Sequence, residues 1–452
     1  MPAALTKAPN AGAERSRYQK LRPGVGRPNG LSHDQVVQHQ RTRLYEAMVE
    51  ITATRGYQAT TIKALCALAG VSRQTFYDLF GADKEACFLG AYDYVVGRAV
   101  ERINLAYRGE EDPERRLCRA FEQFALEAAS ERQAARFALL ETFGAGRAAF
   151  ARMDRGRAMF EGLIAASISD PSGGATLSPT IAKGIVGGVE RVSRVYLLAG
   201  KIDELSAKAD ELSAWVSSYG PWCSSTPAET PKAATRPHAG LRGKDERLRI
   251  LRAAAAIAAG DGYSGLSAAR IIRLAGVSEE TFARFYNGED TIEACFLAAF
   301  DLLGVEALVC AAKASRDAGG WPHGVHSGIT ALMDHVAGHR FVGPVAFIEI
   351  FSVGPSAIER RSRLLRRFAD GLIKRVPDSQ RPSELVAEAI VGAIWALIHD
   401  YVVRGQVHRL RELADDATYL ALTPVIGHEA AIQLILGDGE SVRPGRDLRR
   451  SG

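Results

Sequence analysis

Residues 60–80 read TTIKALCALAGVSRQTFYDLF and carry the clearest structural signal in the chain. They predict two short helices joined by a tight turn, because Gly70 favours the positive φ at which a helix ends. Thr60 is placed to cap the first helix and Ser72 the second, since each hydroxyl can accept a hydrogen bond from a backbone N–H. Two short helices joined by a glycine-containing turn are typical of a helix-turn-helix motif.

The second of these helices, residues 73–80, divides into a buried and an outward face. Arg73, Gln74 and Thr75 lie outward at its N-terminal end, which enters the major groove in motifs of this kind. Arginine can pair with guanine, glutamine with adenine, and threonine can meet the methyl group of thymine. Tyr77 suits a phosphate better than a base edge. The candidate DNA contacts in and beside the motif are Thr60, Thr61, Ser72, Arg73, Gln74, Thr75, Tyr77 and Lys84.

At these residues the chain resembles the TetR family of bacterial transcriptional regulators. The residues that carry the resemblance are Thr60, Ala69, Gly70, Val71, Ser72, Thr75, Tyr77, Phe80, Lys84 and Glu85. The resemblance implies an all-α fold, in which a three-helix DNA-binding domain precedes a helical domain that binds an effector and forms dimers. The spacing from Phe80 to Lys84 is one residue longer than is commonest in the family, which blurs the role of Lys84 as a phosphate contact.

The same pattern occurs a second time in the chain. Ala-Gly-Val-Ser at 69–72 recurs at 275–278, and Glu-Ala-Cys-Phe-Leu at 85–89 recurs at 293–297. The likeness continues downstream with nearly constant spacing. Chance similarity between helical stretches would not keep such a register, so the pattern indicates an internal duplication. We therefore expect two TetR-like units in tandem.

Apolar residues recur at helical spacing and strand signals are nearly absent, so each copy is expected to be all-α with about nine helices. A stretch rich in proline and serine predicts a linker between the copies. The expected divisions are a basic arm (1–35), a helix-turn-helix domain (36–90), an effector-binding and dimerisation domain (91–216), a Pro-rich linker (217–243), a degenerate helix-turn-helix domain (244–300), a second effector-binding and dimerisation domain (301–437) and a basic tail (438–452).

The second copy keeps the buried positions of the motif and changes the outward ones. Glu279 and Glu280 stand at the positions of Arg73 and Gln74. Two carboxylates at the groove-facing end are repelled by the phosphate charge of DNA. We expect the second copy to keep the fold and to have lost or weakened base readout, although Arg284 could still meet a phosphate.

The family resemblance implies dimerisation through the last two helices of each copy, which are residues 180–200 and 203–219 in the first and lie within 383–423 in the second. Gly184 and Gly187, with their neighbour Gly188, would permit close helix approach at such an interface. Two assemblies stay open. One is an intramolecular pseudo-dimer of the two copies, and the other is a homodimer of whole chains.

The helices over residues 113–168, and their copies, are expected to enclose any effector pocket. The apolar side chains that could line it, or equally form plain core, are Phe121, Phe124, Phe137, Leu140, Phe143 and Phe160. The sequence does not name the ligand.

The first thirty residues are rich in arginine and contain a Gly-Arg-Pro core like that of AT-hook proteins. Arg22 and Arg27 on such an arm could enter a narrow minor groove. The alternative is a solvated tail, because charge runs at chain ends are common.

Catalytic and metal-binding functions find little support in the sequence. The six cysteines form no CxxC pair, and His335 and His339 lack the Glu of an HExxH motif. No Ser-His-Asp order, paired catalytic carboxylates or nucleotide loop emerges. We expect no metal, no cofactor and no enzymatic activity.

The fractions of hydrophobic residues (47%) and charged residues (24%) are ordinary for a soluble protein, and the formal net charge of +5 only weakly suggests a polyanionic partner. No signal peptide and no apolar stretch long enough to span a bilayer is recognised, so we expect no membrane and a cytoplasmic, nucleoid-associated bacterial protein. The prediction is a ligand-responsive repressor that binds double-stranded DNA mainly through its first helix-turn-helix and a small-molecule effector elsewhere. The alternative is a helical effector-binding or scaffold protein in which both motifs are vestigial.

Overall fold

In a computed structural model of the chain, the described residues are 32–168, 177–222, 245–288 and 290–437. They contain helices, turns and loops but no strand, which confirms the all-α fold class within the described ranges. Arg22 and Arg27, the linker after residue 222 and the basic tail lie outside the described residues. The helices form two compact units. Unit one contains the described residues up to 101 together with 127–156, and unit two contains 102–126 and those from 157 onward.

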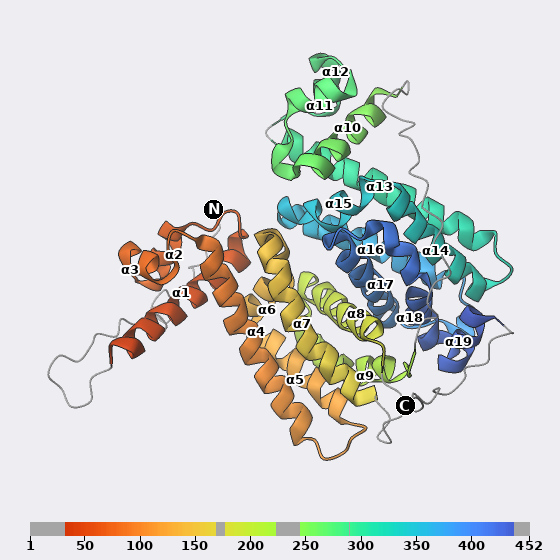
Figure 1. Cartoon of the computed structure of the whole chain (residues 1–452), viewed down its shortest axis with the longest axis horizontal. Helices are drawn as coiled ribbons and strands as arrows, with labels where there is room; N and C mark the ends of the chain where they lie inside the picture. Colours follow the sequence, from red (N-terminus) through yellow and green to blue (C-terminus); the bar gives the residue numbers. More distant parts are fainter. Residues whose placement is uncertain (1–31, 169–176, 223–244, 289, 438–452) are drawn as a thin grey trace, which may run out of the picture. The chain divides into compact units, whose positions relative to one another are not determined.

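The chain order of the helices is shown in Figure 1. In the first half, up to residue 222, they are α1 (His33–Arg55), α2 (Ile62–Ala69), α3 (Arg73–Phe80), α4 (Lys84–Gly109), α5 (Arg116–Ser130), α6 (Arg132–Leu139), α7 (Arg147–Ile168), α8 (Pro179–Leu198) and α9 (Ala209–Ser217). In the second half, from residue 245, they are α10 (Glu246–Asp261), α11 (Ala268–Ala275), α12 (Glu279–Phe285), α13 (Thr291–Arg316), α14 (Trp321–Gly338), α15 (Val342–Phe347), α16 (Pro355–Ile373), α17 (Glu384–Val403), α18 (Ala414–Ile426) and α19 (His428–Leu436).

Unit one is built around α1, which packs against α2 and α6. This helix begins at His33, inside the segment predicted as a basic arm, because Ser32 and Gln35 form a capping box that satisfies its first N–H groups. Its core is made of fully buried apolar side chains from α1, α2, α3, α4 and α6. These include Leu44, Met48, Leu65, Phe76, Phe88 and Phe137.

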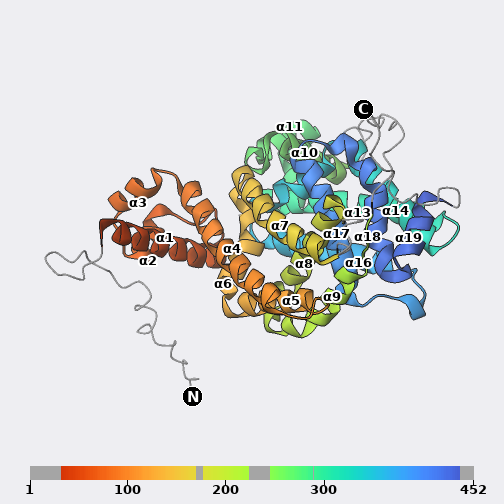
Figure 2. The ribbon, with the colours of Figure 1, turned by 60° about the horizontal axis from the view of Figure 1, so that its bottom comes forward.

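Unit two is organised by the contact between α8 and α17, which lie beside one another in both views (Figures 1 and 2). A Cβ on Gly187 would come closer than 3.0 Å to the side chain of Ala396, and one on Gly392 would do the same to the side chain of Arg191. Each glycine would also place its Cβ within 3.2 Å of the other's carbonyl oxygen. The two backbones therefore approach as closely as only glycine allows.

Buried ion pairs join the same two helices. Arg191 has a side chain only 1% exposed, and its Nε donates to Glu388 Oε2 at 2.8 Å. Its two Nη atoms donate to the Oγ and the carbonyl oxygen of Ser362, in the middle of α16, at 2.8 and 3.0 Å. Lys183 Nζ lies 2.9 Å from Asp400 Oδ1. Removing one partner of such a pair leaves a buried charge without compensation, which is strongly destabilising.

The first residues of the predicted linker are part of this unit. Tyr219 donates its hydroxyl hydrogen to the carbonyl oxygen of Leu420 at 2.8 Å. Trp222 Nε1 donates to Asp416 Oδ1 at 2.7 Å, and its ring stacks on Tyr419 at 4.8 Å. The predicted linker (217–243) therefore starts too early, because Ser217 ends α9 and the side chains of Tyr219 and Trp222 are buried against α18.

Two helices, α13 and α17, are long and apolar enough to cross a membrane by length and composition. Neither is an uninterrupted apolar stretch, because Asp301 and Glu306 interrupt α13, and Glu388 and Asp400 interrupt α17. In α17, 78% of the most apolar window is buried, because α8, α16 and α18 pack around it. In α13 the share is 44%. The core helix of a soluble protein passes the same test, so this length alone does not indicate a membrane.

Candidate nucleic-acid interface and ligand cavity

The turn between α2 and α3 has the geometry that the sequence predicts. Gly70 adopts φ +61° and ψ +36°, the left-handed conformation that suits glycine. Ser72 is the N-cap of α3, and its Oγ accepts a hydrogen bond from the N–H of Thr75 at 3.0 Å. Phe76 is fully buried beneath the turn. Packing of this ring fixes the orientation of α3.

The start of α2 differs by one residue from the prediction. Thr61, not Thr60, is the N-cap, and its Oγ1 accepts from the N–H of Ala64 at 3.2 Å. The hydroxyl of Thr60 instead donates to the carbonyl oxygen of Gly56 at 2.9 Å, and the residue is only 1% exposed. Thr60 is therefore a supporting residue of the α1–α2 connection, and burial removes it from the candidate DNA contacts.

The N-terminal half of α3 presents the predicted polar surface. Ser72, Arg73 and Gln74 are exposed, and Thr75 is partly exposed. Tyr77 is 42% exposed, which is unusual for a large aromatic side chain in a domain with ample core. Gln74 Nε2 donates to the carboxylate of Asp78 at 2.8 Å, so this amide is oriented along the outer face of the helix.

Lys84, at the first position of α4, is directed into the domain. Its Nζ donates to the carbonyl oxygens of Tyr57 and Thr60, each at 3.0 Å, and lies 4.1 Å from the centroid of the Tyr57 ring. Burial lowers the pKa of Lys84 from its usual value. We therefore assign Lys84 the role of fastening α4 to the α1–α2 connection, in place of the phosphate contact predicted from sequence.

One exposed cation beside the motif was missed by sequence reasoning. Lys63 lies in the first turn of α2 and is exposed. The signal that could have revealed it is a lysine two residues after a threonine that caps a helix, since phosphates approach helix N-termini readily.

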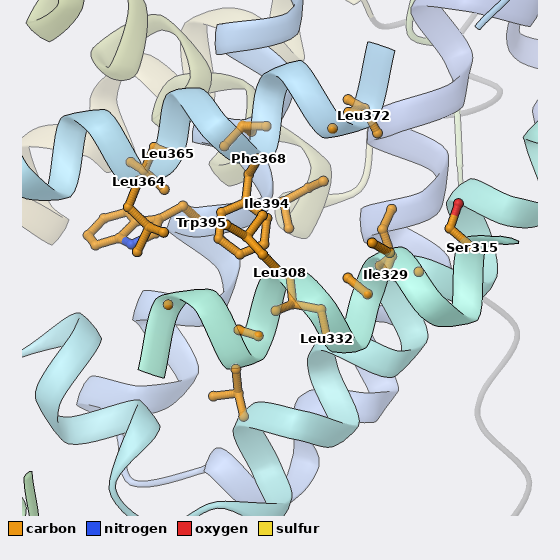
Figure 3. A pocket seen from close by; sticks show the side chains of 18 of the residues that line it. Leu308, Ser315, Ile329, Leu332, Leu364, Leu365, Phe368, Leu372, Ile394 and Trp395 are labelled. Carbon is orange, nitrogen blue, oxygen red and sulfur yellow. The ribbon is translucent and has the colours of Figure 1, made fainter. Parts of the chain in front are cut away.

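A cavity of about 590 Å³ lies among α13, α14, α15, α16 and α17 of unit two. Its walls are mainly apolar, and Leu308, Leu332, Phe368 and Ile394 lie along its length (Figure 3). Trp395 lies at one end of the view and Ser315 at the other. The volume falls within the range of small-molecule sites, roughly 300–1,000 Å³.

The six predicted lining residues of the first half do not form a single site in either unit. Phe137, Leu140 and Phe143 belong to the buried core of unit one. Phe121 and Phe160 belong to unit two, as Phe124 does. The side chains 208 positions after the last three, namely Ile329 for Phe121, Leu332 for Phe124 and Phe368 for Phe160, do line the cavity of the second half.

A comparison with known protein families matches the part of the chain that contains the helix-turn-helix. Residues 44–91 match the description "Bacterial regulatory proteins, tetR family". They form a tetR-family domain. This stretch includes α2, the turn at Gly70 and α3. No curated protein matches the chain.

Several solved structures are similar to part of the chain. The fatty acid degradation regulator FadR from Bacillus halodurans is 17% identical, with 39% of this chain and 96% of that chain covered and a TM-score of 0.35. A TetR-like regulator from Rhodococcus sp. RHA1 is 23% identical, with 41% and 96% covered and a TM-score of 0.33. FadR from Bacillus subtilis in complex with stearoyl-CoA is 16% identical, with 39% and 96% covered and a TM-score of 0.34.

The second half contains a turn with the same backbone geometry as that of the tetR-family domain. Gly276, between α11 and α12, adopts φ +62° and ψ +44°. Glu279 and Glu280 are exposed at the start of α12, where the tetR-family domain has Arg73 and Gln74. A negative surface thus replaces a polar and positive one.

Glu141 supports the tetR-family domain from the neighbouring 3₁₀ turn Glu141–Ala145. It is only 6% exposed and lies 3.6 Å from the place a Cβ would occupy on Gly56, in the α1–α2 connection. Burial raises the pKa of Glu141 to about 7, and Arg136, whose Nη2 lies 3.8 Å away, opposes this rise. Glu141 is therefore a protonatable group beside the connection between α1 and α2.

This raised pKa predicts a pH-dependent stability of unit one. Between about pH 4.5 and about pH 7 the folded state holds a proton that the unfolded state has released, so stability falls as pH rises through this window. The expected loss is up to about 3 kcal/mol, and Glu141→Gln should remove it because the amide does not titrate. Urea unfolding at a series of pH values measures the effect. An unchanged pH dependence in Glu141→Gln would contradict the assignment.

Among the described residues, no group of three or more His, Cys, Asp or Glu side chains is placed to hold a metal ion. His335 and His339 stack with ring centroids 4.2 Å apart, and Nδ1 of His339 lies 2.8 Å from the carbonyl oxygen of His335. The contact with the carbonyl oxygen gives Nδ1 of His339 a hydrogen-bond partner at the C-terminal end of α14.

Proposed function

We propose that the chain is a cytoplasmic, ligand-responsive transcriptional repressor made of two TetR-like units in tandem. The first half of the chain, up to residue 222, reads an operator through α3. The second half, from residue 245, keeps the fold without equivalent base readout. The observation that carries the proposal is the exposure of Arg73 and Gln74 at the N-terminal end of α3, directly after the left-handed turn. Lys63 and Tyr77 flank this surface and would meet phosphates.

The tandem arrangement is supported by a contact that recurs in the two halves. Arg43 on α1 donates to the carbonyl oxygen of Ala69 beside the first turn. Arg249 on α10, 206 residues later, donates to the carbonyl oxygen of Gly276 at 3.2 Å. An arginine at the matching position therefore contacts each turn, and its acceptor in the second half is one residue further along. We keep the proposed domain divisions, with α1 starting at His33 and the linker starting after residue 222.

Arg73→Ala is expected to weaken operator binding by about 1–3 kcal/mol and to relax sequence preference, if the guanidinium pairs with a base. The operator is first obtained by selecting bound fragments from random duplex DNA, and affinities are then measured by fluorescence anisotropy. Glu279→Ala, at the matching position of the second half, is the control and should leave affinity unchanged or slightly higher. If the two variants behave alike, the alternative of a scaffold with vestigial motifs gains support.

We further propose that the two halves form an intramolecular pseudo-dimer through α8 and α17. Gly187 and Gly392 are 205 residues apart and face each other at the crossing. The charges around them differ between the halves, since Glu388 stands 205 residues after Lys183. An α8–α8 pair of the same geometry would bring Arg191 against Lys183, and an α17–α17 pair would bring Glu388 against Asp400. Like charges in a buried interface disfavour both like-with-like pairings.

Light scattering on the DNA-free chain is expected to give a mass near 48.7 kDa, because the pairing surface of each half is already occupied within the chain. A mass near twice that value at low micromolar concentration would show that whole chains associate, and the pseudo-dimer would not then be the complete assembly.

A further inference from the structure

The cavity of unit two is elongated. Its lining on α13 runs from Phe300 to Arg316, which spans about 24 Å at 1.5 Å per residue. On α16 it runs from Arg361 to Leu372, about 17 Å, and Lys374 and Arg375 continue the lining just beyond the helix. Arg375 donates to Ser315 Oγ at 3.1 Å, so the C-terminal ends of the two helices meet at the same end of the cavity. The shape suits a long, narrow ligand.

The other end of the cavity contains a buried cation. Arg361 is only 3% exposed and belongs to the lining. Its guanidinium carbon lies 4.6 Å from the centroid of the Trp395 ring and 4.9 Å from that of Phe351. The two rings offset part of the cost of burying this charge and hold the guanidinium in place.

The surroundings of Arg361 are rich in positive charge. Arg157 and Arg194 share the carboxylate of Glu190, and Arg191 pairs with Glu388. With Arg361 these side chains are four guanidinium groups and two carboxylates, and Arg366 adds a fifth guanidinium, with its Nε 3.4 Å from Glu388. Burial, then Arg194 and Arg191, hold the pKa of Arg361 well below its usual value, although arginine stays protonated in proteins. An anion that reached this end would meet a strong attraction in a medium of low dielectric constant.

We propose that the cavity binds a long-chain apolar monocarboxylic acid, with its carboxylate against the Arg361 guanidinium and its chain extending toward Ser315. This inference rests on the proposed ligand-responsive function and names the ligand class of the second half. The apolar lining between the two ends takes up the chain, whose burial supplies most of the binding free energy. The carboxylate supplies the orientation.

The opposite orientation is less favourable. Arg316, Lys374 and Arg375 stand at the Ser315 end, but all three are exposed. Water and salt screen exposed charges far more than buried ones. These cations lie at the C-terminal ends of α13 and α16, where they also complement the helix dipoles. Exposed cations of this kind raise the local concentration of an anion without fixing it in one position.

The site is connected to the first half of the chain. Ser362 follows Arg361 directly and accepts two hydrogen bonds from Arg191 of α8. A carboxylate bound at Arg361 would therefore lie next to Ser362, the residue through which α16 is hydrogen-bonded to α8. Occupancy of the second half can in this way change the packing of a helix that belongs to the first half.

The test compares an acid with an alcohol of the same chain on the DNA-free full chain. Decanoate, dodecanoate, tetradecanoate and hexadecanoate are titrated beside the matching alcohols, and binding is followed by calorimetry and tryptophan fluorescence, since Trp321 and Trp395 both line the cavity. We expect the best acid to bind at least about tenfold more tightly than its alcohol. Arg361→Met should remove the preference, so that acid and alcohol bind with equal affinity, and far-ultraviolet circular dichroism shows whether the variant folds.

Lys374→Met is the matched control at the Ser315 end, and it should preserve the preference for the acid. The proposal is overturned if no acid of the series binds, if Arg361→Met keeps the preference, or if Lys374→Met loses it. Operator affinity is measured separately without ligand. Intact operator binding with no acid binding contradicts this inference alone, whereas acid binding without operator binding contradicts the proposed function.

Discussion

Arg191→Ala is expected to lower the free energy of unfolding of unit two by about 3–5 kcal/mol, because Glu388 would keep a buried charge after losing its close partner. The remaining contact of Glu388 is Arg366, whose Nε lies 3.4 Å away and whose side chain is 60% exposed. Such a solvated pair compensates little. Urea unfolding followed by far-ultraviolet circular dichroism and by tryptophan fluorescence measures the effect, with the two units treated as separate transitions.

The double variant Arg191→Met with Glu388→Leu is the control for this effect. It removes both charges and keeps apolar volume at the contact, so it should be much less destabilised than Arg191→Ala and can equal the wild type. The interpretation fails if the double variant is as unstable as the single one, because the loss would then come from packing or from the contacts with Ser362.

Gly392→Ala is expected to be the most damaging small substitution in α17. Its methyl group would come closer than 3.0 Å to the side chain of Arg191 and within 3.0 Å of the carbonyl oxygen of Gly187. Because the second atom belongs to the backbone, the helices must move apart, at a cost of about 1–3 kcal/mol or more. The unfolding midpoint of unit two should fall accordingly.

Gly162→Ala provides the matched control. This glycine lies in the interior of α7, and a Cβ placed there would have no atom within 4 Å. Alanine should be neutral or slightly stabilising at this position, since it restricts the unfolded chain and favours the helix. Equal effects of the two substitutions would mean that the crossing of α8 and α17 tolerates a methyl group.

The helix-turn-helix could be predicted from sequence because its signals are local. The glycine turn, the N-cap serine and the buried aromatic follow one another within seven residues, and the structure places Gly70, Ser72 and Phe76 as expected. The start of α2 was misplaced by one residue because Thr60 and Thr61 can both cap a helix. The Lys84 side chain points into the domain because carbonyl groups more than twenty residues earlier in the chain accept its hydrogen bonds. No local sequence pattern specifies these contacts.

The cavity and the buried ion pairs depend on tertiary contacts. Arg191 and Glu388 are 197 residues apart in the chain, and nothing beside either residue indicates the other. The apolar periodicity identified residues that would face inward, but it could not separate core from cavity lining. The difference arises because neighbouring helices fill the space beside Phe137, whereas they leave room beside Leu332.

The crossing of Gly187 and Gly392 has an evolutionary consequence. In a homodimer, residues on the two-fold axis are copies of one codon, so every mutation there is made twice and must fit itself. In this chain the two positions are separate codons, and a change on one side can be matched by a different change on the other. Lys183 opposite Asp400 and Arg191 opposite Glu388 are pairs of that kind. In the proposed pseudo-dimer neither half has to be self-complementary, so one half can change toward sensing while the other keeps the proposed DNA-binding surface.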